Sequence, residues 1–324
     1  MTQDTSSVTT GHAPTPAPGL PVVLDVDLEG RVLARSASEP RQLMEIGRKG
    51  QPRILTSLAT SCTGLYIPGH RTIVVEHDWG GGSTPQLSLL NMVATHIPAG
   101  LEGFHLLAHG AGITHRVLHV HHQGITYLSD DRKRHTLDVW YRDWRSAPQL
   151  LHLDVPADAR ATTSKDGASV AVFSPDVSEI TIHRLLTGET ITVELPPGNI
   201  VTSARLVPDG SRMITTYLRP DGSRGAWWWE GADHVHEARP TIGKVIPGGV
   251  SPDGAHAVCL DEATNTFVLL SIDGDELMRW HCADVGVTTS AAWNIAGDMC
   301  AVDSAGASGA WRWRLADGDI THLW

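Results

Sequence analysis

A glycine-centred turn repeats along the chain at a nearly constant interval, and this repeat limits the folds that the chain can adopt. The clearest copies read Val-Pro-Asp-Gly at 207–210 and Ser-Pro-Asp-Gly at 251–254. Weaker copies complete a series of anchor glycines: Gly30, Gly69, Gly124, Gly167, Gly210, Gly254 and Gly297. By subtraction, the intervals from Gly124 onward are 43, 43, 44 and 43 residues, and the first two are 39 and 55. One four-stranded blade of a β-propeller needs roughly 40–50 residues.

The unit around Gly210 contains the turns and strands of one such blade. Residues 204–207 are predicted to be a strand, and the Pro-Asp-Gly turn follows, with proline setting φ and glycine supplying a positive φ. Residues 213–218, 226–229 and 234–238 are predicted to be the remaining strands. Seven anchors therefore predict an all-β fold, a seven-bladed β-propeller of four-stranded antiparallel blades. The frame starts on an inner strand and ends on an outer one, so we expect no shared-blade clasp.

Length and composition agree with a single propeller domain. Residues 1–20, rich in Thr, Ser and Pro, are predicted to be an N-terminal tail, and residues 21–324 the propeller. A net charge of −11 argues against a nucleic-acid or anionic-membrane surface. We find neither a secretory signal nor a long apolar run, and the four cysteines form no C-x-x-C pair. We therefore expect a cytoplasmic protein with reduced thiols.

Two segments resemble a known family. Residues 71–88, RTIVVEHDWGGGSTPQLS, and 124–141, GITYLSDDRKRHTLDVWY, resemble blades from the N-terminal propeller of prolyl-oligopeptidase-type serine peptidases. The turns at 207–210 and 251–254 also resemble the TolB-like propeller repeat. In that peptidase family a separate α/β-hydrolase domain carries catalysis, and this sequence contains no G-x-S-x-G motif. The resemblance therefore implies a stand-alone propeller, or the separated gating half of something larger, without peptidase activity.

The funnel along a propeller axis is the first place to look for a site. The residues five positions before each anchor are predicted to line it: Asp25, Gly64, His119, Thr162, Arg205, Gly249 and Ala292. His119 is a candidate general acid or base, Asp25 a group that orients it, and Arg205 a stabiliser of negative charge. The alternative is a structural polar belt in which Arg205 pairs with Asp25 and His119 is a satisfied buried histidine.

An insertion at 100–114 carries Glu102, His105 and His109, and is predicted to be a lid over the funnel or, alternatively, a packed surface loop. Trp79, Trp293 and Thr162 are further candidates for substrate binding, whereas Trp311 and Trp313 are expected to pack between blades.

A run of histidines at His115, His119, His121 and His122 is compatible with metal binding. No carboxylate or cysteine completes a known ligand spacing in the sequence, so we predict no metal site and no cofactor.

The favoured hypothesis is a small-molecule enzyme that performs non-hydrolytic acid–base chemistry in the funnel, such as a lyase or an isomerase-type cyclase. Its partner would be a small-molecule substrate. The alternatives are a protein-interaction scaffold and the separated regulatory propeller of a peptidase. Substrate, reaction and oligomeric state stay open, because a fold does not specify them.

Overall fold

The computed structural model describes most of the chain after residue 20. The described residues are 21–36, 39, 41–57, 62–77, 86–91, 104–108, 112–122, 124–131, 133–134, 136–144, 149–152, 159–164, 169–174, 179–185, 187–194, 198–206, 212–222, 224–230, 234–237, 244–261, 264, 266–271, 275–281, 290–294, 296–304 and 309–323. The predicted N-terminal tail, 1–20, lies outside them, so its separation from the rest stays a prediction.

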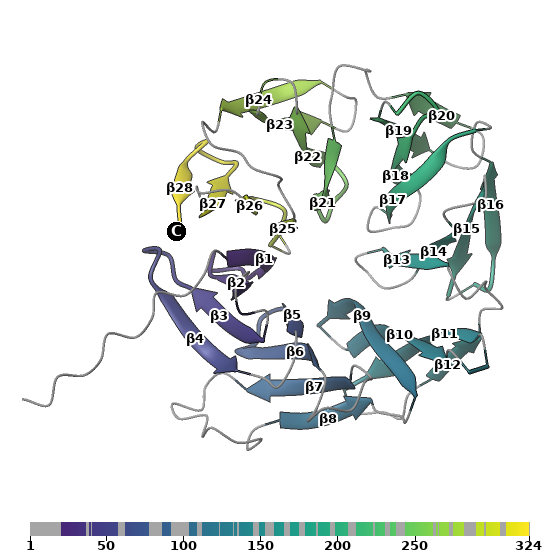
Figure 1. Ribbon diagram of the computed structural model, residues 1–324, viewed down its shortest axis with the longest axis horizontal. Helices are drawn as coiled ribbons and strands as arrows, with labels where there is room; N and C mark the ends of the chain where they lie inside the picture. Colours follow the sequence, from purple (N-terminus) through teal and green to yellow (C-terminus); the bar gives the residue numbers. More distant parts are fainter. Residues whose placement is uncertain are drawn as a thin grey trace, which may run out of the picture.

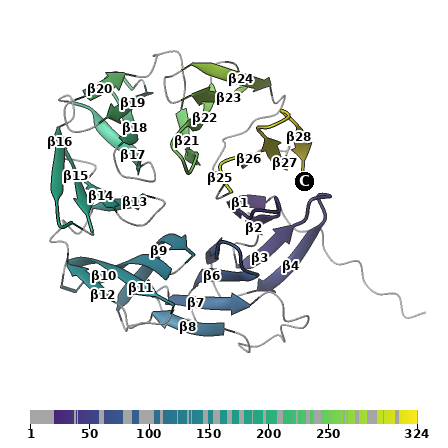
Figure 2. The same ribbon diagram turned by 180° about the vertical axis from the view of Figure 1, so that it is seen from behind.

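The described strands form seven antiparallel sheets of four strands each, and every sheet uses four strands that follow one another in the chain. The sheets stand around a common axis, with the first strand of each innermost (Figures 1 and 2). We call each sheet a blade and number the blades in chain order. The predicted all-β ring of sheets is confirmed.

The strands of blades 1 to 3 follow directly from the N-terminal side. Blade 1 contains β1 (Pro21–Val26), β2 (Val32–Ser36), β3 (Gln42–Ile46) and β4 (Pro52–Ser57). Blade 2 contains β5 (Cys62–Tyr66), β6 (Thr72–His77), β7 (Gln86–Asn91) and β8 (Phe104–Ala108). Blade 3 contains β9 (Ile113–His121), β10 (Gly124–Asp131), β11 (Thr136–Asp143) and β12 (Gln149–His152).

Blades 4 to 7 complete the ring. Blade 4 contains β13 (Arg160–Thr163), β14 (Ser169–Phe173), β15 (Glu179–Arg184) and β16 (Thr190–Glu194). Blade 5 contains β17 (Ile200–Leu206), β18 (Arg212–Leu218), β19 (Arg224–Glu230) and β20 (His234–Glu237). Blade 6 contains β21 (Lys244–Val250), β22 (His256–Asp261), β23 (Thr266–Ser271) and β24 (Glu276–His281). Blade 7 contains β25 (Ala291–Trp293), β26 (Met299–Ser304), β27 (Gly309–Arg314) and β28 (Ile320–His322).

The anchor glycines play two different structural roles. Gly30, Gly69, Gly254 and Gly297 take left-handed φ values of 76°, 75°, 68° and 74°, which a residue with a Cβ adopts only at a cost. Gly124 instead lies within β10, where a Cβ would be 2.3 Å from the carbonyl oxygen of Arg142. Glycine is needed at this position because the backbones of β10 and β11 approach closely, and not because a turn requires it. Gly167 and Gly210 lie outside the described residues.

The core lies between the blades, because each twisted sheet buries both faces against its neighbours. An apolar cluster joins every successive pair, including blades 4 and 5 around Ile180 and Tyr217, and blades 6 and 7 around Phe267 and Trp313. Burial of this kind contributes roughly 25 cal/mol per Å² of apolar surface. It fixes the angle at which each innermost strand faces the axis.

Blades 1 and 7 close the ring by packing, since β1 and β28 belong to separate sheets. Val23 and Val32 of blade 1 share an apolar cluster with Ala301 and Ala310 of blade 7. The buried guanidinium of Arg312 adds a polar contact, donating from Nη1 to the carbonyl oxygen of Gly30 over 2.7 Å. Among the described strands every blade is built from four consecutive strands, which is compatible with the predicted ring without a shared-blade clasp. Among the described residues, no helix has the length and apolar character needed to cross a membrane.

Candidate functional site

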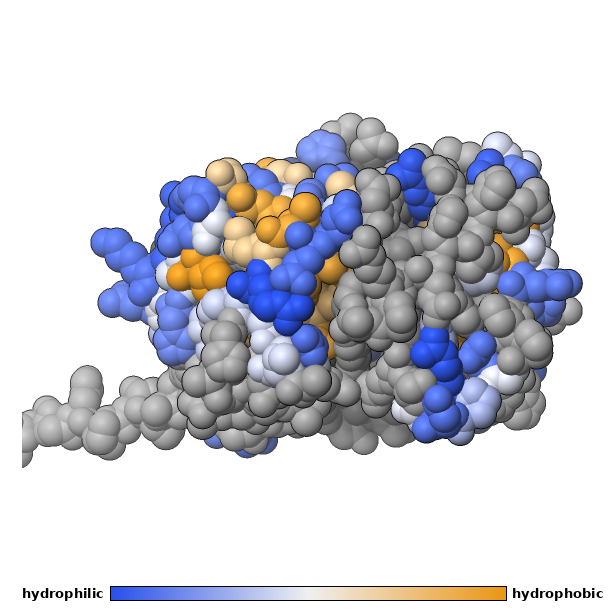
Figure 3. All heavy atoms as spheres, turned by 90° about the horizontal axis from the view of Figure 1, so that it is seen from above, coloured by the Kyte–Doolittle hydropathy of each residue, from blue (hydrophilic) through white to orange (hydrophobic). Residues whose placement is uncertain are grey.

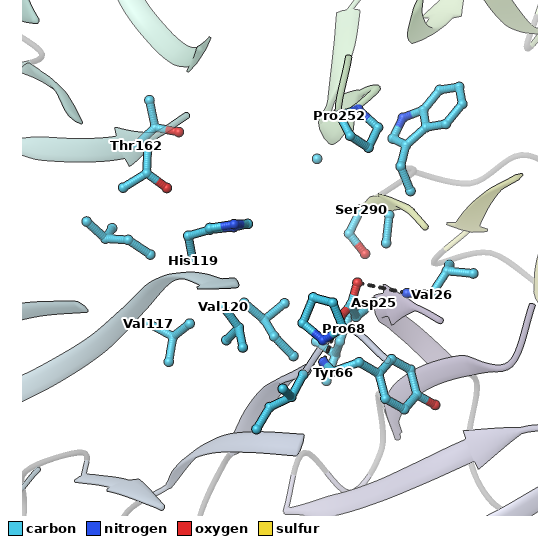
Figure 4. Close-up of a pocket in the computed structure, with 18 of the residues that line it drawn as sticks. Asp25, Val26, Tyr66, Pro68, Val117, His119, Val120, Thr162, Pro252 and Ser290 are labelled. Atoms are coloured by element: carbon cyan, nitrogen blue, oxygen red, sulfur yellow. Dashed lines mark hydrogen bonds between the residues drawn. The ribbon is translucent and has the colours of Figure 1, made fainter. Parts of the chain in front are cut away.

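A cavity of about 1190 Å³ lies on the axis, and residues from every blade line it. The lining includes parts of β1, β5, β9, β13, β21 and β25, with Leu206 from β17. In the close-up, His119 and Thr162 face the hollow from one side, and Pro252, Ser290 and Asp25 from the other (Figure 4). The structure therefore places the funnel where the repeat predicts it.

The predicted inner ring is recovered in part. Asp25, His119, Thr162 and Ala292 all line the cavity. Gly64 and Gly249 lie in β5 and β21, where a Cβ would meet the carbonyl oxygens of Val74 and Val258 at 3.0 and 2.6 Å. Small residues are therefore required there by crowding between the first two strands of a blade. Arg205 lies in β17, but its side chain is outside the described part of the structure, so its predicted role stays untested.

The carboxylate of Asp25 joins blade 1 to blade 2. Its Oδ2 accepts the backbone N–H of Tyr66 over 2.7 Å, and its Oδ1 accepts the backbone N–H of Val26 over 2.9 Å (Figure 4). A carboxylate that receives backbone donors is stabilised in its charged form and held in one orientation. This corresponds more closely to the structural belt that the sequence left open than to a group that orients a catalytic histidine.

His119 belongs to a stack of aromatic rings on blade 3. Its ring lies 5.7 Å from that of His121, which in turn stacks on Tyr141 at 5.2 Å between centroids. Thr162, on β13, is buried. His119 therefore lines the cavity while its ring is stacked on His121, and it is one of several side chains on the cavity wall.

Trp293 lines the axial cavity and also packs between blades, so the ligand platform that the sequence suggested stays a prediction. It is buried, and its Nε1 donates to the carbonyl oxygen of Gly249 in blade 6 over 2.8 Å. Its ring stacks on His256 with the centroids 6.2 Å apart. Trp311 and Trp313 are buried in the same cluster between blades 6 and 7, as predicted.

The predicted lid contains an outer strand of blade 2. Residues 104–108 form β8, which pairs with β7 through Leu87 and Ala108, Ser88 and Leu106, Leu89 and His105, and Leu90 and Phe104. Backbone pairing at the outer edge of a blade places this part of the insertion away from the axis, so a lid role for it is wrong. Glu102, His109 and Trp79 lie outside the described residues, as does the side chain of His105.

The histidine run does not present three rings on one face. A bulge interrupts the pairing of β9 with β10 between Thr126 and Tyr127, which changes the alternation along β9. His115 therefore contacts Ser129, with Nδ1 2.8 Å from Oγ, while His119 and His121 stack on one another. In the part of the chain that the structure describes, no group of three or more His, Cys, Asp or Glu side chains could hold a metal ion.

Sequence reasoning missed two carboxylates that act like Asp25 at other blade joints. Glu76 of blade 2 accepts the backbone N–H of Val117 in blade 3 over 3.2 Å. Asp303 of blade 7 accepts the backbone N–H of Val23 in blade 1 over 2.8 Å. An acidic residue inside an apolar strand is the signal that could have indicated such joints, but the partner strand has no local sequence signature.

A buried carboxylate also organises the joint between blades 1 and 2. Oxygens of Glu45 lie 3.2, 3.6 and 3.8 Å from guanidinium nitrogens of Arg53, Arg71 and Arg31. The Tyr66 hydroxyl donates to Glu45 over 3.3 Å. Burial, together with the negative charges of Glu45, Asp27 and Asp25, raises the pKa of Tyr66 well above its ordinary value. Tyr66 is therefore a neutral donor that fixes the joint.

Comparison with known proteins places the fold but not a family. No family model matches the sequence, and no curated protein matches it. Kluyveromyces lactis Hsv2 superposes with a TM-score of 0.58 at 10% identity, covering 93% of this chain and 96% of that one. The Myceliophteria thermophila Cps50 (Swd1) β-propeller domain gives 0.59 at 10% identity, covering 95% and 98%. The fold is a β-propeller.

TolB from Acinetobacter baumannii is also similar, with a TM-score of 0.52 and 14% identity over 78% of this propeller. The match covers 63% of the TolB chain. The TolB-like repeat that the turns resemble is thus supported as a fold, whereas the resemblance to the prolyl-oligopeptidase propeller stays a prediction.

The comparison corrects the functional hypothesis. Propellers that match nearly the whole chain include Hsv2 and Swd1, and these names describe no lyase, isomerase or cyclase. Within this chain, Asp25 serves a blade joint and residues 104–108 an outer strand. The prediction of a small-molecule enzyme with its pocket in the funnel is therefore wrong.

Proposed function

We propose that this propeller is a protein-interaction scaffold, a rigid ring whose outer surfaces bind partner proteins. The observation that carries the proposal is that carboxylates on the first two strands of three blades bond to the neighbouring blade. Asp25, Glu76 and Asp303 each accept a backbone N–H from the first strand of the next blade. These carboxylates hold blades together, so the surface that remains for recognition is the rim and the two faces.

Rigidity is the physical advantage of this arrangement. A surface held in one conformation loses little conformational entropy when a partner binds, and more of the contact energy is retained as affinity. The apolar cluster between every pair of blades and the buried joints supply that rigidity.

The proposal includes an intracellular, reducing setting, as the sequence predicts. Cys259 and Cys300 are free and buried, which is the usual state of thiols in such a compartment. We also propose that the propeller has low affinity for nucleic acid, because its net charge is −11.

The test is to purify the tagged full chain from cells that produce it naturally, after cross-linking, and to rebuild any complex from purified components. We expect at least one partner protein that binds the purified propeller at a fixed ratio. A tag-only sample and the heat-unfolded chain are the controls. A chain that reconstitutes with no protein, in cross-linked and native samples alike, would contradict the scaffold proposal.

A further inference from the structure

The outer rim between blades 6 and 7 carries apolar side chains that the core does not fully cover. Met278 and Trp280 of β24, with Leu315 and Ile320 of blade 7, are partly buried and pack against the cluster between the two blades. Figure 3 views the ring edge-on from the side of β24. Apolar side chains gather in its left half, where β24 and β28 lie in Figure 1. We call these four residues the rim patch.

Aromatic rings pack beneath the rim patch and hold its side chains in place. Trp280 packs edge-on against Trp311 with centroids 5.1 Å apart, and Trp311 lies 5.4 Å from His322. The turn after β27 contacts the same place, because a Cβ on Gly318 would be 3.2 Å from Cε of Met278. Leu277, next along β24, has 50% of its surface exposed. It lies at a bulge, since Leu269 pairs with Met278 and Leu270 with Glu276.

Acidic groups surround the rim patch. Arg279 pairs with Asp261 at 2.9 Å and with Glu276 at 2.8 Å, and Arg314 pairs with Asp317 at 2.7 Å and lies 3.9 Å from Asp319. Within these ion pairs four carboxylates face two guanidinium groups, so the paired residues keep a net negative charge at neutral pH. The further guanidinium of Arg312, near Arg314 and Asp319, is buried. A partner that buries the patch gains most if it brings positive charge to this border.

Charge also argues against two other occupants. The first 20 residues of the chain contain no Lys or Arg, so this segment cannot complement the border. A second copy of the chain carries the same net charge of −11, and would bring like charge to the patch.

We propose that the rim patch binds a linear segment of a partner protein that carries two or more apolar side chains flanked by Lys or Arg. The apolar side chains would cover Met278, Trp280 and Ile320, and the basic ones would lie against Glu276, Asp317 and Asp319. Burial of the apolar groups supplies affinity, and the acidic border supplies the preference for a basic segment. This inference rests on the proposed scaffold function and names its site and partner chemistry.

A displayed library of short random peptides, selected on the purified full chain, tests the site. The variant Met278→Ser/Ile320→Ser removes apolar surface from the rim patch, and Asp317→Asn/Asp319→Asn removes negative charge from its border. Ile200→Ser is the matched control, because Ile200 is 46% exposed on β17 of blade 5. We expect selected peptides to be apolar and basic. Each double variant should weaken them by roughly tenfold or more, and the control should leave binding unchanged.

Unchanged binding to both double variants would overturn the rim-patch proposal while leaving the scaffold function intact, as would selected peptides without basic residues. Analytical ultracentrifugation separates the remaining alternative. A dimer of the wild-type chain that disappears in Met278→Ser/Ile320→Ser would show that a second copy occupies the patch, and would also overturn the proposal. Thermal unfolding of each variant confirms that lost binding comes from the surface and not from unfolding.

Discussion

The backbone N–H of Val23 donates to Oδ2 of Asp303 over 2.8 Å, and this bond joins residues from opposite ends of the chain. The Asp303 side chain is fully buried. It also receives the backbone N–H of Ser290 over 3.2 Å and the hydroxyl of Ser290. Ser290 in turn contacts the carbonyl oxygen of Val23 over 2.6 Å. One carboxylate therefore satisfies several donors at the junction of blades 1 and 7, in addition to the apolar packing there.

Replacing Asp303 should loosen the ring measurably. Asp303→Ala leaves a buried N–H and a hydroxyl without their acceptor, so we expect a loss of about 2–3 kcal/mol in the free energy of unfolding. Asp303→Asn should cost less, because one oxygen remains. Urea unfolding measures both, with Asp319→Ala as a control at an exposed ion pair. Equal unfolding midpoints for Asp303→Ala and Asp319→Ala would refute the assigned closure.

Two glycines with the same backbone conformation should respond differently to alanine. Gly69 and Gly248 have φ values of 75° and 78°, so both substitutions impose similar backbone strain. A Cβ on Gly69 meets nothing within 4 Å, and we expect Gly69→Ala to cost about 1 kcal/mol.

The second glycine lies against a neighbouring blade. A Cβ on Gly248 would be 2.0 Å from the carbonyl oxygen of Ala291, so Gly248→Ala must also push blades 6 and 7 apart. We expect a cost of at least about 3 kcal/mol in the free energy of unfolding. Equal costs for the two variants, measured by urea unfolding, would show that blade contact at Gly248 is unimportant.

The repeat was predictable because its signal is local. A glycine-centred turn needs a positive φ within a few residues, and Gly30, Gly254 and Gly297 adopt it. The position of Asp25, His119 and Thr162 on the cavity wall followed from counting back along the innermost strand. Composition alone did not indicate two of these innermost strands, because β13 is polar and β21 contains a proline and two glycines; the repeat located them.

The roles of the predicted residues could not be read in the same way. Asp25 bonds to Tyr66, 41 positions away, and Asp303 to Val23, 280 positions away, so neither partner leaves a local pattern. The insertion was interpreted as a lid because the repeat placed it in a connection between two blades at the funnel mouth, yet the backbone of residues 104–108 pairs with β7. The sequence of this apolar segment is compatible with a lid and with an outer strand, and only the backbone pairing distinguishes the two. The partner protein cannot be predicted from the sequence either, because a fold does not determine what binds it.

The two buried thiols should be unreactive in the folded protein. Burial raises the pKa of Cys259 to about 12, and burial also raises the pKa of Cys300. Because the thiolate is the reactive form, iodoacetamide near pH 8 should modify neither residue until urea unfolds the chain. Peptide mass spectrometry reads each cysteine separately. Rapid labelling of Cys259 without denaturant would indicate that blade 6 opens readily.

Glu76 should give the fold a pH dependence of defined sign. Burial raises the pKa of Glu76 above its ordinary value of 4.5, against the opposing bond from Val117 and the charges of Arg116 and Arg35. The folded state therefore holds this proton more tightly than the unfolded state. The contribution of Glu76 to stability falls as pH rises from the unfolded pKa through the folded pKa.

Glu76→Gln tests this sign, because the amide keeps an acceptor for Val117 and cannot ionise. Relative to wild type, the variant should gain stability as pH rises between about 4 and 7, measured by urea unfolding. Glu276→Gln is the opposite case. The hydrogen bond from Arg279 lowers the pKa of Glu276, so that side chain stabilises the fold above its unfolded pKa and loses this effect as pH falls. Parallel pH profiles for wild type and Glu76→Gln would mean that the joint between blades 2 and 3 does not hold a desolvated carboxyl group.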